Sequence, residues 1–106
     1  MDALIVLCTC PDAETAARLA ATLVEERLAA CVNRIAGIAS TYRWNGALTT
    51  GEETLLLIKT TNARYAALQT RIVELHPYEL PEVLAIAASE GLAPYLAWLA
   101  RETRPA

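Results

Sequence analysis

Two cysteines and the single histidine are the side chains of this chain best suited to hold a soft metal ion. Cys8 and Cys10 are two residues apart, so in an extended strand both side chains point to the same face. Thiolate sulfur suits Cu(I) and zinc, and the imidazole of His76 is a further ligand for such metals. These three residues are therefore the candidate metal ligands.

Each candidate also has a structural interpretation that the sequence leaves open. Free cysteine is among the most frequently buried residue types, so the pattern favours Cys8 as a small buried strand residue over a ligand. Cys31 follows the apolar residues 28–30 and is more readily explained as part of the core. His76 precedes Pro77 at the expected end of a helix, where an imidazole can interact with the helix dipole.

Nothing in the sequence is typical of an enzyme. Nucleophilic catalysis needs a base beside the nucleophile, and no serine or cysteine is linked to His76 by a known spacing. Phosphate binding favours a glycine-rich loop before a helix, whereas the loop Cys10-Pro11-Asp12 has neither glycine nor positive charge. The cysteines form Cys-x-Cys and not the Cys-x-x-Cys of a soft-metal carrier loop. We therefore expect no enzymatic activity.

Lys59 and Glu79 could form a buried or interfacial ion pair, or could be two solvated charges. Pro77 and Pro81 stiffen the connector over residues 76–82 and should place Tyr78 and Glu79 rigidly. We predict that Glu79 lies near Lys59 or an arginine, within the protomer or across an interface.

A long hairpin over residues 31–61 should position these groups. Asn45-Gly46 is a strong signal for a two-residue turn, because a type I′ turn needs positive φ at both central residues. Such a turn places Trp44 opposite Ala47, Tyr42 opposite Thr49 and Val32 opposite Lys59, unless a bulge at Gly51 shifts the register.

The hairpin should project beyond the rest of the protomer. An arm of about 14 residues reaches roughly 45 Å at ~3.3 Å per residue, whereas a compact chain of this length has a diameter of roughly 33 Å. A projecting strand pair that carries Tyr42 and Trp44 indicates a partner surface. The alternative is a bend or bulge that folds the tip back.

The remaining segments predict a regular order of elements. The apolar run 3–9 predicts a strand, Asp12 caps a helix that runs to about Ala29, and Asn62 caps a helix that Pro77 ends. Residues 83–88 predict a short strand, although their alanines also suit a helix, and residues 92–101 predict a last helix. The order is that of an α+β, ferredoxin-like βαββαβ fold with a C-terminal helix and both long helices on one face of the sheet. We expect a second copy of the chain to cover the other face.

Composition limits the possible partners. The 106 residues fit a single domain over 1–106, and the net charge of −3 provides no basic surface for nucleic acid. No apolar run approaches the ~20 residues of a membrane span. The start Met1-Asp2-Ala3 lacks the basic residues of a signal peptide. An odd number of cysteines without a secretion signal favours reduced thiols in the cytoplasm.

Motifs along nearly the whole chain resemble the CutA family of divalent-cation-tolerance proteins. They are Leu7-Cys8-Thr9-x-Pro11, Glu26-Arg27-Leu28-Ala29-Ala30-Cys31-Val32-Asn33, Ser40-x-Tyr42-x-Trp44-x-Gly46, Ile58-Lys59-Thr60, His76-Pro77-Tyr78-Glu79-x-Pro81-Glu82 and Tyr95-Leu96-x-Trp98.

The resemblance implies a homotrimer similar to PII-type signalling proteins, in which long hairpins wrap neighbouring subunits. It also implies a role in tolerance to copper and other divalent metals. The copper ligands proposed for the family fall on Cys8 and His76, whereas Leu75 stands where the family has the first histidine of a pair. Cys10 is then a further candidate ligand.

Two classes of function follow. The first is a copper-binding buffer or sensor, for which we predict weak, thiol-dependent Cu(I) binding that Cys8→Ser impairs more than His76→Ala. We expect a Cys8–His76 site either to lie between subunits or to use only one of the two residues. The second is a PII-like signalling or scaffold trimer that binds a small molecule or protein in intersubunit clefts near Tyr42, Trp44, Lys59, Tyr78 and Glu79.

Overall fold

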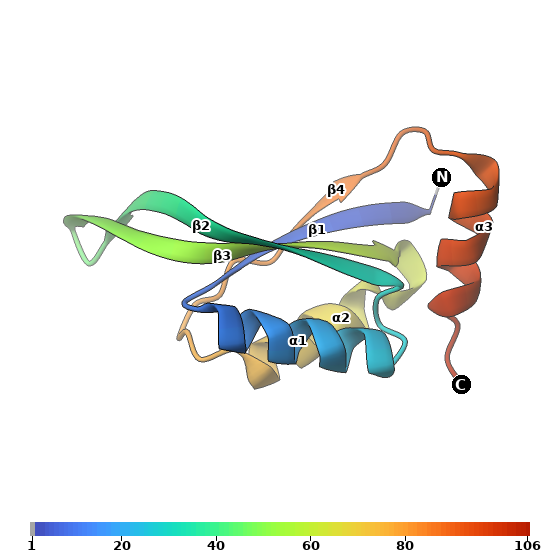
Figure 1. The fold of residues 1–106 in the computed structure, drawn as a ribbon, viewed down its shortest axis with the longest axis horizontal. Coiled ribbons are helices and arrows are strands. Elements are labelled where there is room, and N and C mark those ends of the chain that lie inside the picture. Colours follow the sequence, from blue (N-terminus) through green and yellow to red (C-terminus); the bar gives the residue numbers. More distant parts are fainter. Residues whose placement is uncertain (1) are drawn as a thin grey trace.

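The computed structural model describes residues 2–106, and Met1 lies outside the described residues. One antiparallel sheet has the strand order β2-β3-β1-β4. Helices α1 and α2 lie side by side under one face, and α3 stands at the end of the sheet opposite the hairpin tip (Figure 1). This is the predicted ferredoxin-like arrangement. Its elements are β1 (Ala3–Cys10), α1 (Ala13–Glu25), β2 (Cys31–Trp44), β3 (Ala47–Thr61), α2 (Asn62–Leu75), β4 (Leu84–Ala87) and α3 (Ala93–Glu102).

Strand β1 organises the core because its side chains alternate between the two faces of the sheet. Val6, Cys8 and Cys10 are fully buried on the face that the helices cover. They pack in one cluster with Leu19 and Leu23 of α1, Leu56 and Ile58 of β3, and Leu68 and Ile72 of α2. The even-numbered residues of β1 therefore build the interior.

Helix α1 ends four residues before the predicted Ala29. Arg27 adopts a positive φ of 59°, which a helix cannot continue through. The backbone N–H groups of Leu28 and Ala29 then both donate to the carbonyl of Leu23, at 2.9 and 3.1 Å. This turn directs the apolar residues 28–30 into the interior. They are therefore buried although they lie beyond the end of α1.

Helix α2 starts without the predicted side-chain cap. Thr61 occupies the N-cap position and Asn62 is the first helical residue, with no capping hydrogen bond from a side chain. The Asn62 N–H instead donates to the carbonyl of Asp2 at 2.9 Å. Pro77 ends the helix as predicted, because His76 before it takes an extended conformation.

The hairpin has the predicted turn and length, but its bulge lies elsewhere. Trp44 pairs with Ala47 and Tyr42 with Thr49, while Ser40 pairs with Gly51 without any break in the register. The register shifts between Ile35 and Ile38. Ala36 and Gly37 therefore oppose a single residue of β3, and Gly37 has a φ of +72°.

The bulge changes which side chains of β2 share a face. Val32 pairs with Ile58 and not with the predicted Lys59, which pairs with Cys31. Directly paired residues lie on the same face of a sheet, so Val32 faces the helices. Beyond the bulge the even-numbered residues Tyr42 and Trp44 lie on the opposite face. The bulge thus turns the aromatic tip away from the helix layer.

The hairpin projects well past the helices and β1 (Figure 1), and the longest dimension of the molecule is 44 Å. Tyr42 and Trp44 are 44% and 41% exposed in the single chain. The helix-free face of the sheet is also apolar, because it exposes the large aliphatic residues Leu84 (59%), Ile86 (50%) and Ile35 (43%). No helix of residues 2–106 is long and apolar enough to cross a membrane.

Candidate functional site

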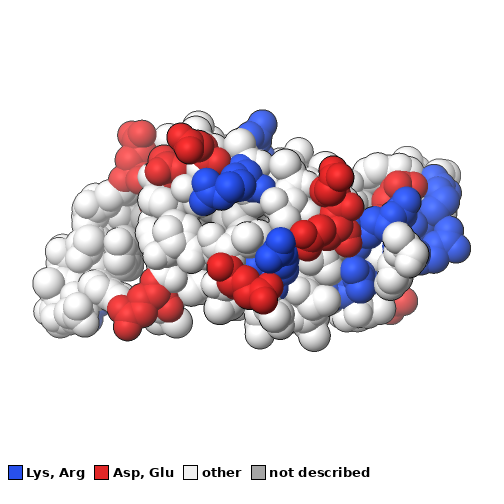
Figure 2. Space-filling model, turned by 90° about the horizontal axis from the view of Figure 1, so that it is seen from below, with Lys and Arg blue, Asp and Glu red and all other residues white. Residues whose placement is uncertain are grey.

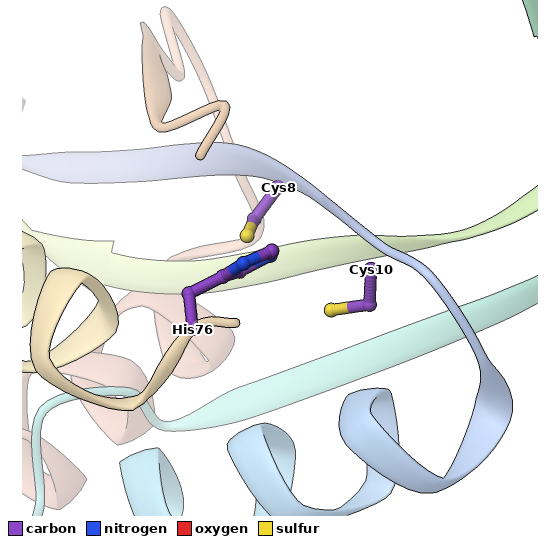
Figure 3. Close-up of side chains that lie close together, drawn as sticks. All are labelled: Cys8, Cys10 and His76. Carbon is purple, nitrogen blue, oxygen red and sulfur yellow. The ribbon is translucent and has the colours of Figure 1, made fainter. Parts of the chain in front are cut away.

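The three predicted metal ligands converge in one protomer. The Sγ atoms of Cys8 and Cys10 and a ring nitrogen of His76 all lie within 4.8 Å of one another. Both thiols point from β1 toward the imidazole, which enters from the end of α2 (Figure 3). The two cysteines are fully buried and His76 is 7% exposed, so the cluster is closed to solvent.

The direction of α2 explains why the cluster forms within one chain, contrary to the expectation of an intersubunit site. Strand β3 is antiparallel to β1, and α2 returns from the end of β3 along the direction of β1 (Figure 1). The C-terminal ends of α2 and β1 therefore meet at the same end of the molecule. The expectation was wrong because it took α2 to run antiparallel to β1.

Both ring nitrogens of His76 are occupied by hydrogen bonds. Nε2 lies 2.8 Å from the carbonyl oxygen of Thr9 and donates to it, because a carbonyl only accepts. Nδ1 accepts the backbone N–H of Tyr78 at 3.1 Å. This pattern fits the neutral tautomer that carries its proton on Nε2. Through these two hydrogen bonds, His76 fastens the chain segment that follows α2 to β1.

The two thiols share one environment but have opposite tendencies to ionise. Interaction with the Cys10 thiol and burial raise the pKa of Cys8, whereas the hydrogen bond from Cys8 lowers the pKa of Cys10. Of the two thiols, Cys10 is therefore the one that loses its proton more readily. A thiolate, and not a thiol, is the form that binds a metal.

The spacing of the three donors fits a soft metal ion. Two sulfurs at ~2.3 Å from one metal lie about 3.8 Å apart at a tetrahedral angle and about 4.6 Å apart in a linear site. The observed limit of 4.8 Å needs only a small inward movement of the side chains. No carboxylate belongs to this cluster within residues 2–106, which favours a soft ion over a hard one.

A second feature is a groove of about 880 Å³ between the hairpin tip and the connector after α2. Four of the predicted cleft residues line it, namely Tyr42, Trp44, Tyr78 and Glu79. Thr9, Ser40, Thr41, Glu53, Pro77, Leu80, Pro81 and Glu82 complete its wall. The groove is formed within one chain.

Glu53 is the groove residue that the sequence analysis missed. It is 9% exposed, and its Oε2 accepts a hydrogen bond from the Tyr78 hydroxyl at 2.7 Å. Burial, together with Glu53, raises the pKa of Tyr78. The signal was the period-two pattern of β3, which places Glu53 on the same face as the apolar Leu55 and Leu57, where an isolated carboxylate is unusual.

Lys59 does not belong to the groove. It lies near the opposite end of β3, opposite Ile5 of β1 and Cys31 of β2. Among residues 2–106, neither Lys59 nor the exposed Glu79 forms an ion pair, and the salt bridges join Arg71 to Glu26 and Glu74, and Arg101 to Glu102. Glu79 therefore forms no direct ion pair within the described residues of the protomer, and its predicted proximity to Lys59 or an arginine, within the protomer or across an interface, stays a prediction.

Comparison with known proteins gives a consistent result. A family model described as CutA1 divalent ion tolerance protein matches residues 4–102. The divalent-cation tolerance protein CutA of Thermus thermophilus is 48% identical over 93% of this chain and 96% of its own length. The crystal structure of CutA from Xylella fastidiosa superposes with a TM-score of 0.96 at 45% identity, covering 98% of this chain and 100% of that chain. CutA1 from Oryza sativa gives a TM-score of 0.95 at 40% identity, covering 98% and 95% of the two chains.

Proposed function

Since the chain belongs to the CutA1 family of divalent ion tolerance proteins, we propose that it contributes to metal tolerance by binding Cu(I) through Cys8 and Cys10, with His76 as an auxiliary ligand. The observation that carries this proposal is the convergence of two sulfurs and one imidazole nitrogen within 4.8 Å. The three thiols of the chain are free, so none is consumed by a disulfide.

The two sulfurs are the primary donors in this proposal. Cu(I) accepts few soft ligands, and thiolates suit it better than imidazole. Each nitrogen of His76 already has a partner, so binding a metal requires the loss of the hydrogen bond to the Thr9 carbonyl or of the one from the Tyr78 N–H. Removal of a cysteine should therefore weaken Cu(I) binding more than removal of the histidine.

Burial should make the site slow to load. Cys8 and Cys10 have no exposed surface, and the imidazole of His76 lies over them. A metal ion can reach the sulfurs only when the connector after α2 moves. The site therefore suits a buffer that exchanges copper slowly, in a compartment that keeps thiols reduced.

A competition titration against a Cu(I) chelator under reducing conditions tests the proposal. The wild type should hold Cu(I), and the Cys8→Ser/Cys10→Ser variant should lose it. Cys31→Ser is the matched control because this third thiol is not part of the cluster. Equal binding by the wild type and the double variant would exclude the cysteines as ligands.

We further propose that the chain acts as a homotrimer. Leu84, Ile86 and Ile35 leave half or nearly half of their surface exposed on the helix-free face of the sheet. Monomeric proteins rarely expose contiguous apolar surface of this kind. Static light scattering at micromolar concentration should give three times the mass of the chain, and a monomer would contradict this part of the proposal.

A second candidate function is ligand binding in a PII-like protein. The groove favours it because aromatic and polar side chains converge on a concavity of about 880 Å³, which falls within the usual size of a small-molecule site. A bound small molecule that protects Tyr42 and Trp44 from solvent would support this candidate. If a small molecule protected these residues equally in the Cys8→Ser/Cys10→Ser variant, ligand binding in the groove would be independent of the metal proposal.

A further inference from the structure

Within residues 2–106, the strands place two charged side chains on the helix-free face of the sheet. Directly paired residues share a face, and the register of the ladders assigns Glu53 and Lys59 of β3 to this one. The other strand residues on the face are apolar or uncharged. The helix-bearing face, in contrast, shows acidic and basic side chains close to one another over much of its length (Figure 2). The two charges of the helix-free face are therefore isolated on an otherwise uncharged surface.

Glu53 and Lys59 do not neutralise each other within one chain. Residues 53 to 59 of an extended strand span about 20 Å at ~3.3 Å per residue, whereas an ion pair needs a contact of about 4 Å or less. Leu55 and Leu57 lie between them on the same face. No salt bridge among residues 2–106 includes either side chain. Each charge therefore lacks an opposite charge within the described part of the chain.

Both side chains are already partly removed from water in the single chain. Glu53 is 9% exposed, and the Tyr78 hydroxyl donates to its Oε2 at 2.7 Å. Lys59 is half-buried between Ile5 of β1 and Cys31 of β2. A copy that covers this face removes more water from both, and a charge in such a place is costly unless an opposite charge contacts it. The covering surface must therefore provide a cation for Glu53 and an anion for Lys59.

A second copy of the same chain meets both requirements. In a ring of identical subunits each interface joins two different patches, and the same contact repeats around the ring. The acidic end of β3 in one subunit can then face the basic end of β3 in the next. Arg34 and Arg43 of β2 are less suitable cations because they lie on the opposite face. Glu79 is a less suitable anion because it is exposed on the connector.

We propose that Glu53 of each subunit forms an ion pair with Lys59 of the partner subunit. The Tyr78 hydroxyl holds the carboxylate in position for this contact, and the pair is complete only in the assembly. Because the two charges lie at opposite ends of an apolar strand face, the contact fixes the register in which two such faces pack. The inference rests on the homotrimer proposed above and names the contact that aligns its subunits.

Charge reversal tests this contact in the full chain, with sedimentation over a dilution series as the measurement. Glu53→Lys and Lys59→Glu each bring two like charges together at every interface, so the concentration at which the trimer dissociates should rise roughly tenfold or more. Glu53→Lys/Lys59→Glu restores opposite charges and should reverse most of this rise. Glu53→Lys/Arg34→Glu is the matched control, because it has the same net charge but changes an arginine on the opposite face. It should recover nothing.

Neutral variants keep the test decisive if a reversed charge prevents folding, which circular dichroism would show. Glu53→Gln keeps an acceptor for the Tyr78 hydroxyl, and Lys59→Met keeps most of the aliphatic chain. Positions about 20 Å apart in one chain should contribute independently. A combined effect on dissociation that is smaller than the product of the two single effects would therefore show contact between subunits. A combined effect equal to that product would overturn the inference.

The outcomes also separate this inference from the homotrimer itself. A wild type that does not sediment as a trimer removes the homotrimer, and the inference with it. A wild-type trimer whose charge-swapped variant stays as weak as Glu53→Lys keeps the homotrimer but overturns the contact. Recovery of Lys59→Glu by Glu79→Lys, and not by Glu53→Lys, would assign the lysine to Glu79 and would also overturn it.

Discussion

The cysteine–histidine cluster and the groove lie on either side of the same short connector, and they differ in how complete they are. In the cluster both ring nitrogens of His76 have hydrogen-bond partners, and the side chains are closed to solvent. In the groove of the single chain, carboxylates and rings line a concavity, and within residues 2–106 the carboxylate of Glu53 accepts one side-chain hydrogen bond, from the Tyr78 hydroxyl. Residues 76–78 join the two, because His76 faces the cluster and Tyr78 faces the groove.

Donor chemistry and access are therefore separate requirements for a binding site. The cluster has the better ligands for a metal, but a metal must displace existing contacts to reach them. The groove has no soft donors, but a ligand can enter it without breaking any contact within the chain. Variants of the cluster and variants of the groove should therefore change different properties of the protein. Five expectations test this, in order of decreasing effect.

The largest effect should come from a groove residue, Trp44, and should concern the assembly. Trp44→Ala removes a ring that is 41% exposed in the single chain and that an assembled trimer should bury. By analogy with the truncation of core aromatic residues, the assembly should weaken by about 3–5 kcal/mol. Sedimentation over a dilution series measures this. An unchanged dissociation profile would show that the ring is not an interface anchor.

In the cysteine–histidine cluster, His76→Ala should destabilise the fold by about 2–4 kcal/mol. The substitution leaves a cavity, and it removes the hydrogen-bond partner of the buried Thr9 carbonyl and of the Tyr78 N–H. Tyr78→Phe is the comparison on the groove side and should cost about 1 kcal/mol, since only the bond to Glu53 is lost. Urea unfolding measures both. A larger loss for Tyr78→Phe would contradict the view that the cluster is the more completely bonded region.

Within the cluster, the ligands should not contribute equally to copper binding. Cys8→Ser should lower Cu(I) affinity about 100-fold, or about 2.7 kcal/mol, and His76→Ala about tenfold. The reason is that sulfur is the primary donor, whereas His76 must first give up a hydrogen bond. Chelator competition ranks the two variants, and the reverse order would make the imidazole the primary ligand.

The bulge at Ala36–Gly37 determines the face of the sheet on which the groove residues of β2 lie. Its contribution to stability should be smaller. Gly37 has a φ of +72°, so Gly37→Ala introduces backbone strain of about 1 kcal/mol although the space around it is open. Gly51→Ala is the matched control, because Gly51 has open space and no positive φ. Thermal unfolding measures the stability of both variants, and Gly37→Ala should be the less stable. Equal stability of the two variants would remove the strain argument.

The smallest effect concerns pH. Burial and Glu53 raise the pKa of Tyr78 above its usual value near 10. Because the raised pKa belongs to the folded state, this contribution to stability is complete below about pH 10 and is lost as pH rises further. Unfolding measured at pH 9 and pH 11 should show a steeper loss for the wild type than for Tyr78→Phe. Identical slopes would contradict the assignment.

The helices, strands and candidate ligand types follow from local sequence patterns. A short continuous apolar run identified β1, Pro77 set the end of α2, and Asn45-Gly46 located the turn of the hairpin. These features are local, because each depends on the conformational preferences of a few adjacent residues. For the same reason the sequence identified Cys8, Cys10 and His76 as candidate ligands, and Tyr42, Trp44, Tyr78 and Glu79 as candidate cleft residues.

Which of these residues meet depends on how the elements pack in three dimensions. The direction of α2 relative to β1 brought His76 to the cysteines within one chain, and the bulge at Ala36–Gly37 turned the aromatic tip to the helix-free face. Glu53 acquired its role because the connector, 25 residues away in the chain, places the Tyr78 hydroxyl against it. Such contacts depend on register and on element direction over long sequence distances, and a shift of one residue reverses the face on which every side chain of a strand lies.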